Sequence, residues 1–186
     1  KDCMIELVKR SQSALSQLPD ASDLLKQEAP LYAGQSHYIE WANQRKPYTH
    51  TDCEYLPLGE VMFKRLCEEL NKAQEYIFME FFIVEEGTMW NTLLKILGEK
   101  VKAGVEVRMM YDDLGCIMTL PDHYDQKLEA MGIKTVVFNR FTAHLTVSHN
   151  NRDHRKITVI DGNVGFNGGI NLADEYINAY AKHGHW

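Results

Sequence analysis

The sequence predicts an α/β fold with a mostly parallel central sheet flanked by helices. From residue 54 onward, short runs rich in β-branched and aromatic residues alternate with longer segments whose apolar residues recur at helical spacing. The first run, residues 76–84, has Glu80 as its one charged residue, which is typical of a buried parallel strand. Gly104 and Gly132 follow helical segments, where loops that lead into a strand favour glycine. Strands that alternate with helices imply parallel pairing.

The elements are expected in the following order. Residues 1–18 form a helix that ends before Pro19, and residues 20–55 show no persistent period, so only a short helix near residues 23–27 is expected there. Helices and strands then alternate, ending in a hairpin of two strands. The expected helices are 58–74, 88–102 and 121–131, and the expected strands are 76–84, 105–111, 133–138, 157–160 and 164–166. Thr88 is expected to cap the helix that it begins.

The chain has 186 residues, enough for one ordinary domain. We assign residues 1–53 to an N-terminal helix and a connecting segment, and residues 54–186 to the α/β domain. Because the first residue is Lys1 rather than Met, we expect the sequence to be part of a longer polypeptide.

Composition argues against several classes of protein. The 26 acidic and 20 basic residues give a net charge of −6, which argues against a nucleic-acid partner. The most apolar run, residues 76–84, is far shorter than the roughly 20 residues of a spanning helix, so we expect a soluble chain. The four cysteines form no CxxC pair, and we expect reduced thiols. No metal is expected either at the histidines that lack acidic partners at ligand spacing, which are His144, His149, His183 and His185.

The hairpin is the most informative segment. A Gly-Asn pair at 162–163 is a two-residue hairpin signal, and this turn sets the register of the two strands. In that register His154 lies opposite Asn171, and Lys156 lies opposite Gly169. A turn one residue earlier would shift every pairing.

This register predicts a phosphate-binding gap beside a nucleophile. His154 and Lys156 are two residues apart and project from one face of the strand, with Asn171 beside His154. Gly169 offers no side chain opposite Lys156 and, with Gly168, lets the backbone approach a ligand closely. Lysine supplies charge, asparagine supplies N–H donors, and His154 can attack phosphorus.

Asp161 is expected to have a different task. It lies on the opposite pleat from Lys156 and roughly 17 Å along the strand, at ~3.3 Å per residue. We therefore predict a turn residue or an ion-pair partner rather than a phosphate ligand.

Residues at fixed spacing in this segment match the HKD signature of the phospholipase D superfamily at every defined position. They are His154-x-Lys156, Asp161 after four further residues, and Gly168-Gly169-x-Asn171 after another six. The stretches FMEFFIVEEGTMW, GVEVRMMYDDLG and GGINLADEYIN closely resemble bacterial cardiolipin synthases of the phospholipase D type. The resemblance covers residues 54–186, whereas residues 1–53 match only loosely.

The resemblance implies a phospholipase D-like half-domain and a reaction without cofactor or metal. In such enzymes two halves each give one HKD motif to a shared site. One histidine forms a phosphohistidine with a phosphatidyl group and the other protonates the leaving alcohol. A second phosphatidylglycerol then accepts the phosphatidyl group, which yields cardiolipin and glycerol at the cytoplasmic face of the cell membrane.

Only His154 has a lysine two residues later, so this chain carries one motif. We therefore expect the N-terminal half of the catalytic region, inactive alone. Its partners are expected to be phosphatidylglycerol and either the second HKD half of the same polypeptide or a second copy.

Several carboxylates are candidates for supporting the site. Asp174 or Glu175 could accept the Nδ1 proton of His154, or could simply be acids that favour a helix start. Asp113 ends a strand at the edge where α/β sites form, as does Asp112. Glu80 needs a partner in its apolar strand, and the related synthases carry Glu here.

Charge near the motif supports an anionic ligand. Residues 140–156 hold four basic residues and one acidic residue, an excess that suits a phosphate head group. A solvated loop would show the same excess. Two alternatives remain open beside the phosphatidyltransferase: a phosphodiesterase or nuclease of the same superfamily that acts as a dimer, and a non-catalytic folding or interaction unit.

Overall fold

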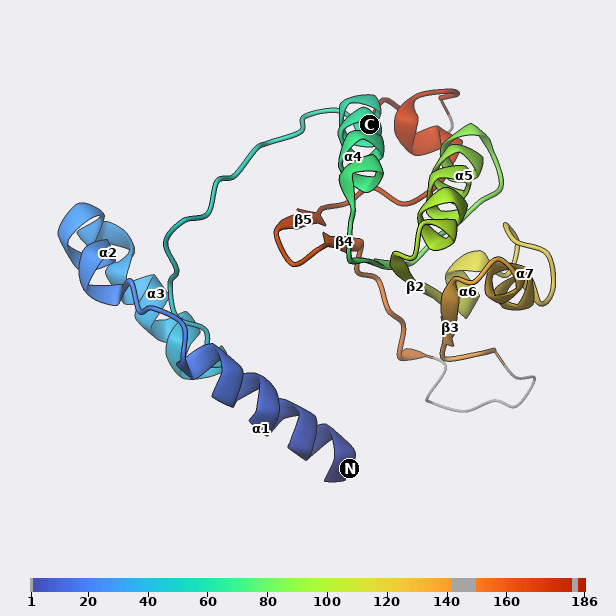
Figure 1. The fold of residues 1–186 in the computed structure, drawn as a ribbon. Helices are drawn as coiled ribbons and strands as arrows, with labels where there is room; N and C mark the ends of the chain where they lie inside the picture. The colour runs from blue at the N-terminus through green and yellow to red at the C-terminus, as the bar shows by residue number, and fades with distance from the viewer. Residues whose placement is uncertain (1, 142–149, 182–183) are drawn as a thin grey trace. The chain divides into compact units, whose positions relative to one another are not determined.

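Three helices form the first of the two units into which the chain divides, Lys1–Tyr55, in this computed structural model (Figure 1). They are α1 (Asp2–Ser16), α2 (Ser22–Glu28) and α3 (Pro30–Asn43). The first two are confirmed, whereas α3 lies where the sequence predicts no helix. The apolar residues of α3 are not gathered on one face of the helix, so periodicity does not reveal it. The structure describes residues 2–141, 150–181 and 184–186.

The second unit, Leu56–Trp186, is built on a five-stranded sheet in the order β3-β2-β1-β4-β5. Strands β1, β2 and β3 run parallel, and the β4–β5 hairpin joins β1 in antiparallel fashion. The predicted α/β class is confirmed, with a mixed sheet whose parallel half comes from the alternating strands and helices. The strands are β1 (Tyr76–Phe81), β2 (Glu106–Asp112), β3 (Lys134–Phe138), β4 (Ile157–Ile160) and β5 (Val164–Asn167).

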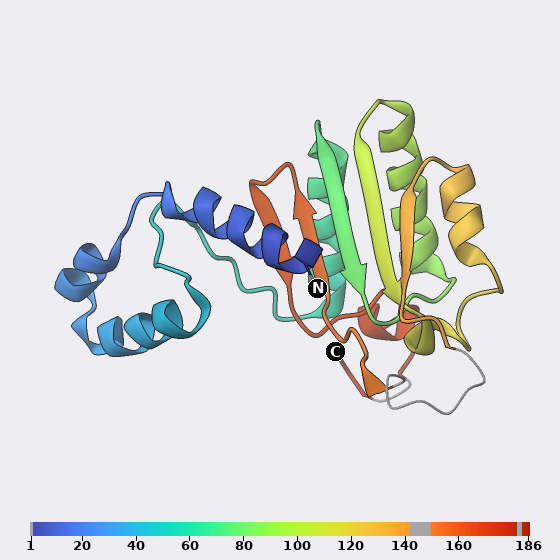
Figure 2. The same ribbon diagram turned by 90° about the horizontal axis from the view of Figure 1, so that it is seen from below.

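The helices α4 (Gly59–Lys72), α5 (Thr88–Lys102) and α7 (Tyr124–Ala130) cover one face of the sheet (Figure 2). The side chains of β1 alternate between this buried face and the other. The Trp90 indole donates to the Tyr124 hydroxyl at 2.8 Å, so this buried N–H is satisfied. The core between sheet and helices includes Leu66, Leu70, Ile77, Trp90, Leu93, Leu97, Met109, Leu128 and Ile133.

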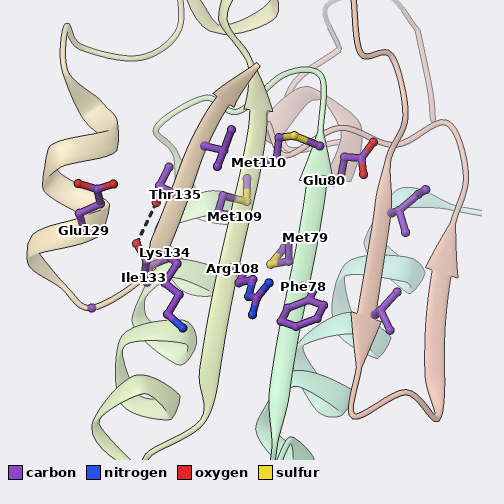
Figure 3. A pocket seen from close by; sticks show the side chains of 14 residues that line it. Phe78, Met79, Glu80, Arg108, Met109, Met110, Glu129, Ile133, Lys134 and Thr135 are labelled. Atoms are coloured by element: carbon purple, nitrogen blue, oxygen red, sulfur yellow. Dashed lines mark hydrogen bonds between the residues drawn. The ribbon is translucent and has the colours of Figure 1, made fainter. Parts of the chain in front are cut away.

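The other face of the sheet carries a groove of about 740 Å³ (Figure 3). Arg108 lies over the Phe78 ring at 4.7 Å from its centroid. Several of the apolar side chains that line the groove alternate with the buried residues of the sheet, so they point away from the helices. They include Phe78, Met110, Val136, Ile157 and Val159.

The β4–β5 hairpin differs by one residue from the predicted register. Ile160 pairs with Val164, so residues 161–163 form a three-residue loop instead of a two-residue turn. Asp161 and Gly162 both adopt positive φ, 51° and 69°. The Asp161 carboxylate accepts backbone N–H groups at the start of β1, and this removes Asp161 from the ladder.

The shifted register changes the predicted neighbours of the motif residues. The ladder ends at Ile157 and Asn167, before it reaches the motif residues on either side. Two predicted pairs are therefore wrong, namely His154 with Asn171 and Lys156 with Gly169.

The start of α5 also differs from prediction. Thr88 does not cap the helix, because the N-cap position is occupied by Gly87, which has no side chain. Instead, the N–H groups of Thr88 and Met89 donate to the Asp174 carboxylate at 2.9 and 2.7 Å. A Cβ on Gly87 would lie 2.7 Å from that carboxylate, so any larger residue here would displace the Asp174 side chain. Asp174 itself begins η2 (Asp174–Ile177), a short 3-10 helix.

Candidate functional site

The site is organised around Phe82 and Ile83, the two residues that follow β1. On one side Gly115 of α6 (Asp113–Cys116) packs on the Phe82 backbone, where a Cβ would lie 2.0 Å from the Phe82 carbonyl oxygen. On the other side the Leu172 N–H donates to the Ile83 carbonyl at 3.1 Å. The two residues are therefore held between packed segments, which makes them a rigid support.

His154 and Lys156 both contact Phe82. The His154 side chain is exposed, and its ring centroid lies 4.8 Å from that of Phe82. Lys156 is buried, with its Nζ 5.3 Å from the Phe82 ring centroid, and it donates to the His154 carbonyl at 2.6 Å. Burial lowers the pKa of Lys156, although Asp153 opposes this shift. The His154 imidazole is thus exposed to solvent, and the buried Lys156 ammonium group lies against the His154 backbone.

Asn171 is attached to the same support from the other half of the motif. Its side chain is buried, its Oδ1 accepts the Ile83 N–H at 3.0 Å, and its Nδ2 donates to the Tyr176 hydroxyl at 2.9 Å. Both halves of the motif therefore attach to consecutive residues after β1. One of the two amide N–H bonds predicted for phosphate is used by Tyr176.

Gly168 and Gly169 lie at an exposed bend before Asn171. A Cβ at either position would meet no protein atom within 4 Å. Protein packing therefore does not explain glycine here. Open space beside the backbone is what the predicted approach of a ligand needs.

Asp161 lies at the opposite end of β1. Its carboxylate accepts the N–H groups of Gln74, Glu75 and Tyr76, each at 2.8 Å. Partial burial opposes ionisation, but these three donors lower the pKa of Asp161. Asp161 is therefore a turn residue that joins the hairpin to β1.

Glu80 lies on the groove side of the sheet and contacts the residues on either side of His154. Its Oε1 is 2.6 Å from Arg155 Nε, and Arg155 Nε donates to Asp153 at 3.0 Å. Burial, a hydrogen bond with Asp153 and the charge of Asp153 raise the pKa of Glu80 to about 7. Burial would also raise the pKa of Asp153, but hydrogen bonds from Arg155 and Glu80 lower it. The raised pKa of Glu80 and the lowered pKa of Asp153 make Glu80 the member of the pair that holds a proton, up to about pH 7.

The other predicted supporting carboxylates are placed as follows. Both oxygens of Asp174 are occupied by α5, so its contacts do not support a role beside His154. Asp113 accepts the Phe141 N–H at 2.6 Å. Glu175 is buried in η2, and its role as partner of His154 stays a prediction.

Sequence reasoning missed two contributors to the site, Phe82 and Arg152. Phe82 continues the apolar run of β1, and periodicity alone indicates a core residue there. Arg152 lies in the predicted basic cluster but donates to the Asp112 carboxylate at 3.2 Å. Three of the four basic residues in that cluster form ion pairs with carboxylates, namely Arg140, Arg152 and Arg155. Their charge is therefore partly neutralised within the fold.

Within the described ranges, no three His, Cys, Asp or Glu side chains gather in a way that could hold a metal ion. His144, His149 and His183 lie outside those ranges. Of the helices described, none has the length and apolarity that a membrane crossing requires.

Comparison with known proteins defines the family. Residues 66–180 match the family model described as "Cardiolipin synthase, PLD-like domain". The chain belongs to this family. A cardiolipin synthase of Oceanobacillus iheyensis is 34% identical over 152 residues, which cover 80% of this chain and 31% of that protein. An uncharacterized protein of Streptococcus mutans is 49% identical over 151 residues, 81% of this chain and 33% of the relative.

The PLD-like fold is also seen in a solved structure. NucT from Helicobacter pylori superposes with a TM-score of 0.51 at 14% identity, over 67% of this chain and 76% of NucT. At that identity the likeness concerns the fold alone. The chain spans about a third of the length of the curated relatives named above.

Proposed function

We propose that this chain is one catalytic half of a phosphatidyltransferase that converts two phosphatidylglycerol molecules into cardiolipin and glycerol. One observation carries the proposal: the exposed imidazole of His154 rests on Phe82 beside the buried Lys156, in a chain of the cardiolipin synthase, PLD-like domain family. An exposed imidazole is available to a substrate, and a buried cation beside it favours a phosphate.

The reaction has two displacements at phosphorus. A histidine nitrogen attacks the phosphodiester, an N–P bond forms, the P–O bond to glycerol breaks, and a second histidine protonates the leaving glycerol. A hydroxyl of the second phosphatidylglycerol then attacks, the N–P bond breaks, and the hydroxyl proton passes to the second histidine. His154 supplies one of these two roles, nucleophile or acid. The histidine of a second half or copy supplies the other.

The remaining motif residues divide by position. Lys156 and Asn171 lie on the support formed by Phe82 and Ile83, and we assign them to the phosphate. Gly168 and Gly169 leave open space for its approach. Phosphatidylglycerol resides in a bilayer, so we place the complete protein at the cytoplasmic face of the cell membrane.

The test uses the complete protein with vesicles of labelled phosphatidylglycerol. We expect cardiolipin and glycerol in equal amounts, and a loss of at least about 10³-fold in the His154→Gln variant. His37→Gln makes the same chemical change at an exposed position of α3 and serves as the matched control, with activity unchanged.

Parallel assays with single- and double-stranded DNA distinguish the alternatives. Cleavage of DNA without conversion of phosphatidylglycerol would replace the proposal by a nuclease. Turnover of neither substrate by correctly folded complete protein would indicate a non-catalytic unit.

A further inference from the structure

Asp112 forms a fully buried hydrogen-bond network at the carboxyl end of β2. Its exposed fraction is 0%, and its carboxylate accepts four N–H donors. Oδ1 accepts the backbone N–H groups of Leu114 and Gly115 at 2.9 and 3.2 Å and Arg152 Nη1 at 3.2 Å. Oδ2 accepts the backbone N–H of Asp153 at 2.8 Å. A buried carboxylate is tolerated when its charge is compensated in this way.

The four donors have two different purposes. Leu114 and Gly115 belong to α6, for which Asp112 is an ordinary N-cap. The other two donors, from Arg152 and Asp153, belong to the two residues that immediately precede His154. Half of this carboxylate's hydrogen bonds are therefore made to the approach to the proposed catalytic residue.

Arg152 extends the network to the end of β3. Its Nη2 donates to the Asn139 carbonyl at 2.7 Å, and the Asn139 side chain donates to the Asn151 carbonyl at 2.8 Å. Arg152 is itself mostly buried, with 13% of its side chain exposed. The residues just after β3 and just before His154 are thus joined to each other and to β2.

We propose that Asp112 and Arg152 are positioning residues that fix His154 on Phe82 by holding the backbone of residues 152–153. This inference rests on the proposed function, because it gives a reason for anchoring the backbone directly before the histidine. Neither residue needs to touch substrate. A displacement of about 1 Å at a reacting group can cost up to about 10²-fold in rate.

The first test is Asp112→Asn in the complete enzyme. The asparagine oxygen can still accept from α6, but its NH₂ group then faces the Asp153 N–H, donor against donor. We expect kcat for phosphatidylglycerol to fall about 10- to 100-fold while KM changes less than about twofold. Glu106→Gln removes a carboxylate at the other end of the same strand and is expected to leave kcat unchanged.

Arg152→Lys is the second variant, and it carries the test if Asp112→Asn does not fold. Lysine keeps the charge but cannot reach Asp112 and Asn139 through one planar group, so an intermediate loss of kcat is expected. Folded Asp112→Asn or Arg152→Lys protein with the kcat of Glu106→Gln would overturn the inference. So would a rise in KM alone, because it would indicate a role in binding.

A readout without turnover separates this inference from the proposed function. Carbethoxylation of His154 by diethyl pyrocarbonate, followed by mass spectrometry, reports the placement of the imidazole whatever the substrate is. We expect its rate to rise several-fold in Asp112→Asn and not in Glu106→Gln, since the ring leaves Phe82. An unchanged rate would overturn the positioning role, whereas failure to convert phosphatidylglycerol would overturn only the proposed function.

Discussion

The two ends of β1 hold different parts of one signature. At the carboxyl end, Phe82 supports the exposed ring of His154 and the buried ammonium group of Lys156. At the amino end, Asp161 accepts three backbone N–H groups within a loop of positive φ. Four residues separate Lys156 from Asp161 in the sequence, yet the structure gives these two positions different environments.

The difference shows that sequence spacing alone does not define a catalytic group. The hydrogen bonds of the Asp161 carboxylate connect the hairpin to residues 74–76, where β1 begins, which is a contribution to stability. His154 keeps its ring at the surface, where it is available to a ligand. The comparison therefore separates activity from stability, and the predictions below test that separation.

The largest effect is expected when no second half or copy is present to complete the site at the carboxyl end of β1. The 186-residue chain has one HKD histidine, and the loss of a nucleophile or an acid typically costs 10²–10⁴-fold or more. We expect negligible phosphatidylglycerol conversion by the dilute chain, with residual activity that rises as the square of protein concentration. A dilution series measures this order, and turnover linear in protein at nanomolar levels would show that one motif suffices.

The next largest effect is expected from a substitution of Asp161 at the amino end of β1. Asp161→Asn keeps a residue that tolerates positive φ but removes the charge from three hydrogen bonds. We expect the free energy of unfolding to fall by about 2 kcal/mol and kcat of the folded complete enzyme to change little. Urea denaturation and initial rates measure the two quantities. Loss of kcat without loss of stability would place Asp161 in the chemistry and remove the contrast between the ends.

Periodicity predicted the elements that bury an apolar face. Apart from the four-residue helix α6, the helices and strands from residue 58 to 138 alternate as expected, because each has a stripe or run of apolar residues against the core. The apolar residues of the missed helix α3 are spread around its circumference, so the sequence carried no such signal. The hairpin register was off by one residue because a side-chain contact 85 residues away in sequence, from Asp161 to Tyr76, decides the loop.

The candidate site was predictable only in its residue types. The HKD spacing points to His154 and Lys156, and both lie at the same support. Their shared contact with Phe82 depends on how β4 enters beside β1, which no local pattern specifies. The Asp112 network likewise joins residues 40 positions apart.

A smaller effect is expected from the proton that Glu80 holds beside Asp153. The pKa of Glu80 is about 7 in the fold against 4.5 ordinarily, so the folded protein binds this proton more tightly. That contribution to stability is complete below about pH 4.5 and is lost as the pH rises through 7. The lowered pKa of Asp153 acts below its ordinary 3.8, outside this window.

Glu80→Gln mimics the protonated acid at every pH. The variant should match the parent protein in unfolding free energy near pH 4 and exceed it by roughly 1–2 kcal/mol near pH 8, at ~1.4 kcal/mol per pKa unit reduced for partial exposure. Urea denaturation at several pH values measures the difference. A difference that does not change with pH would show that Glu80 is already ionised at pH 5.

The smallest effect is expected from removal of metal ions. In the proposed function, Lys156 at the carboxyl end of β1 supplies the positive charge that a phosphate requires, and Asn171 supplies an amide from the same support. These groups are part of the chain, so a chelator does not remove them. We therefore expect EDTA to leave the turnover of the complete enzyme within about twofold of its starting value. Lys156→Met, by contrast, should reduce turnover by at least about 10²-fold. Charge-assisted contacts to phosphate contribute about 1.5–3 kcal/mol, and they contribute more in the transition state. Initial rates before and after dialysis against EDTA measure the first effect. If EDTA abolished turnover, zinc restored it and Lys156→Met stayed active, the positive charge at phosphorus would come from a metal ion rather than from the lysine.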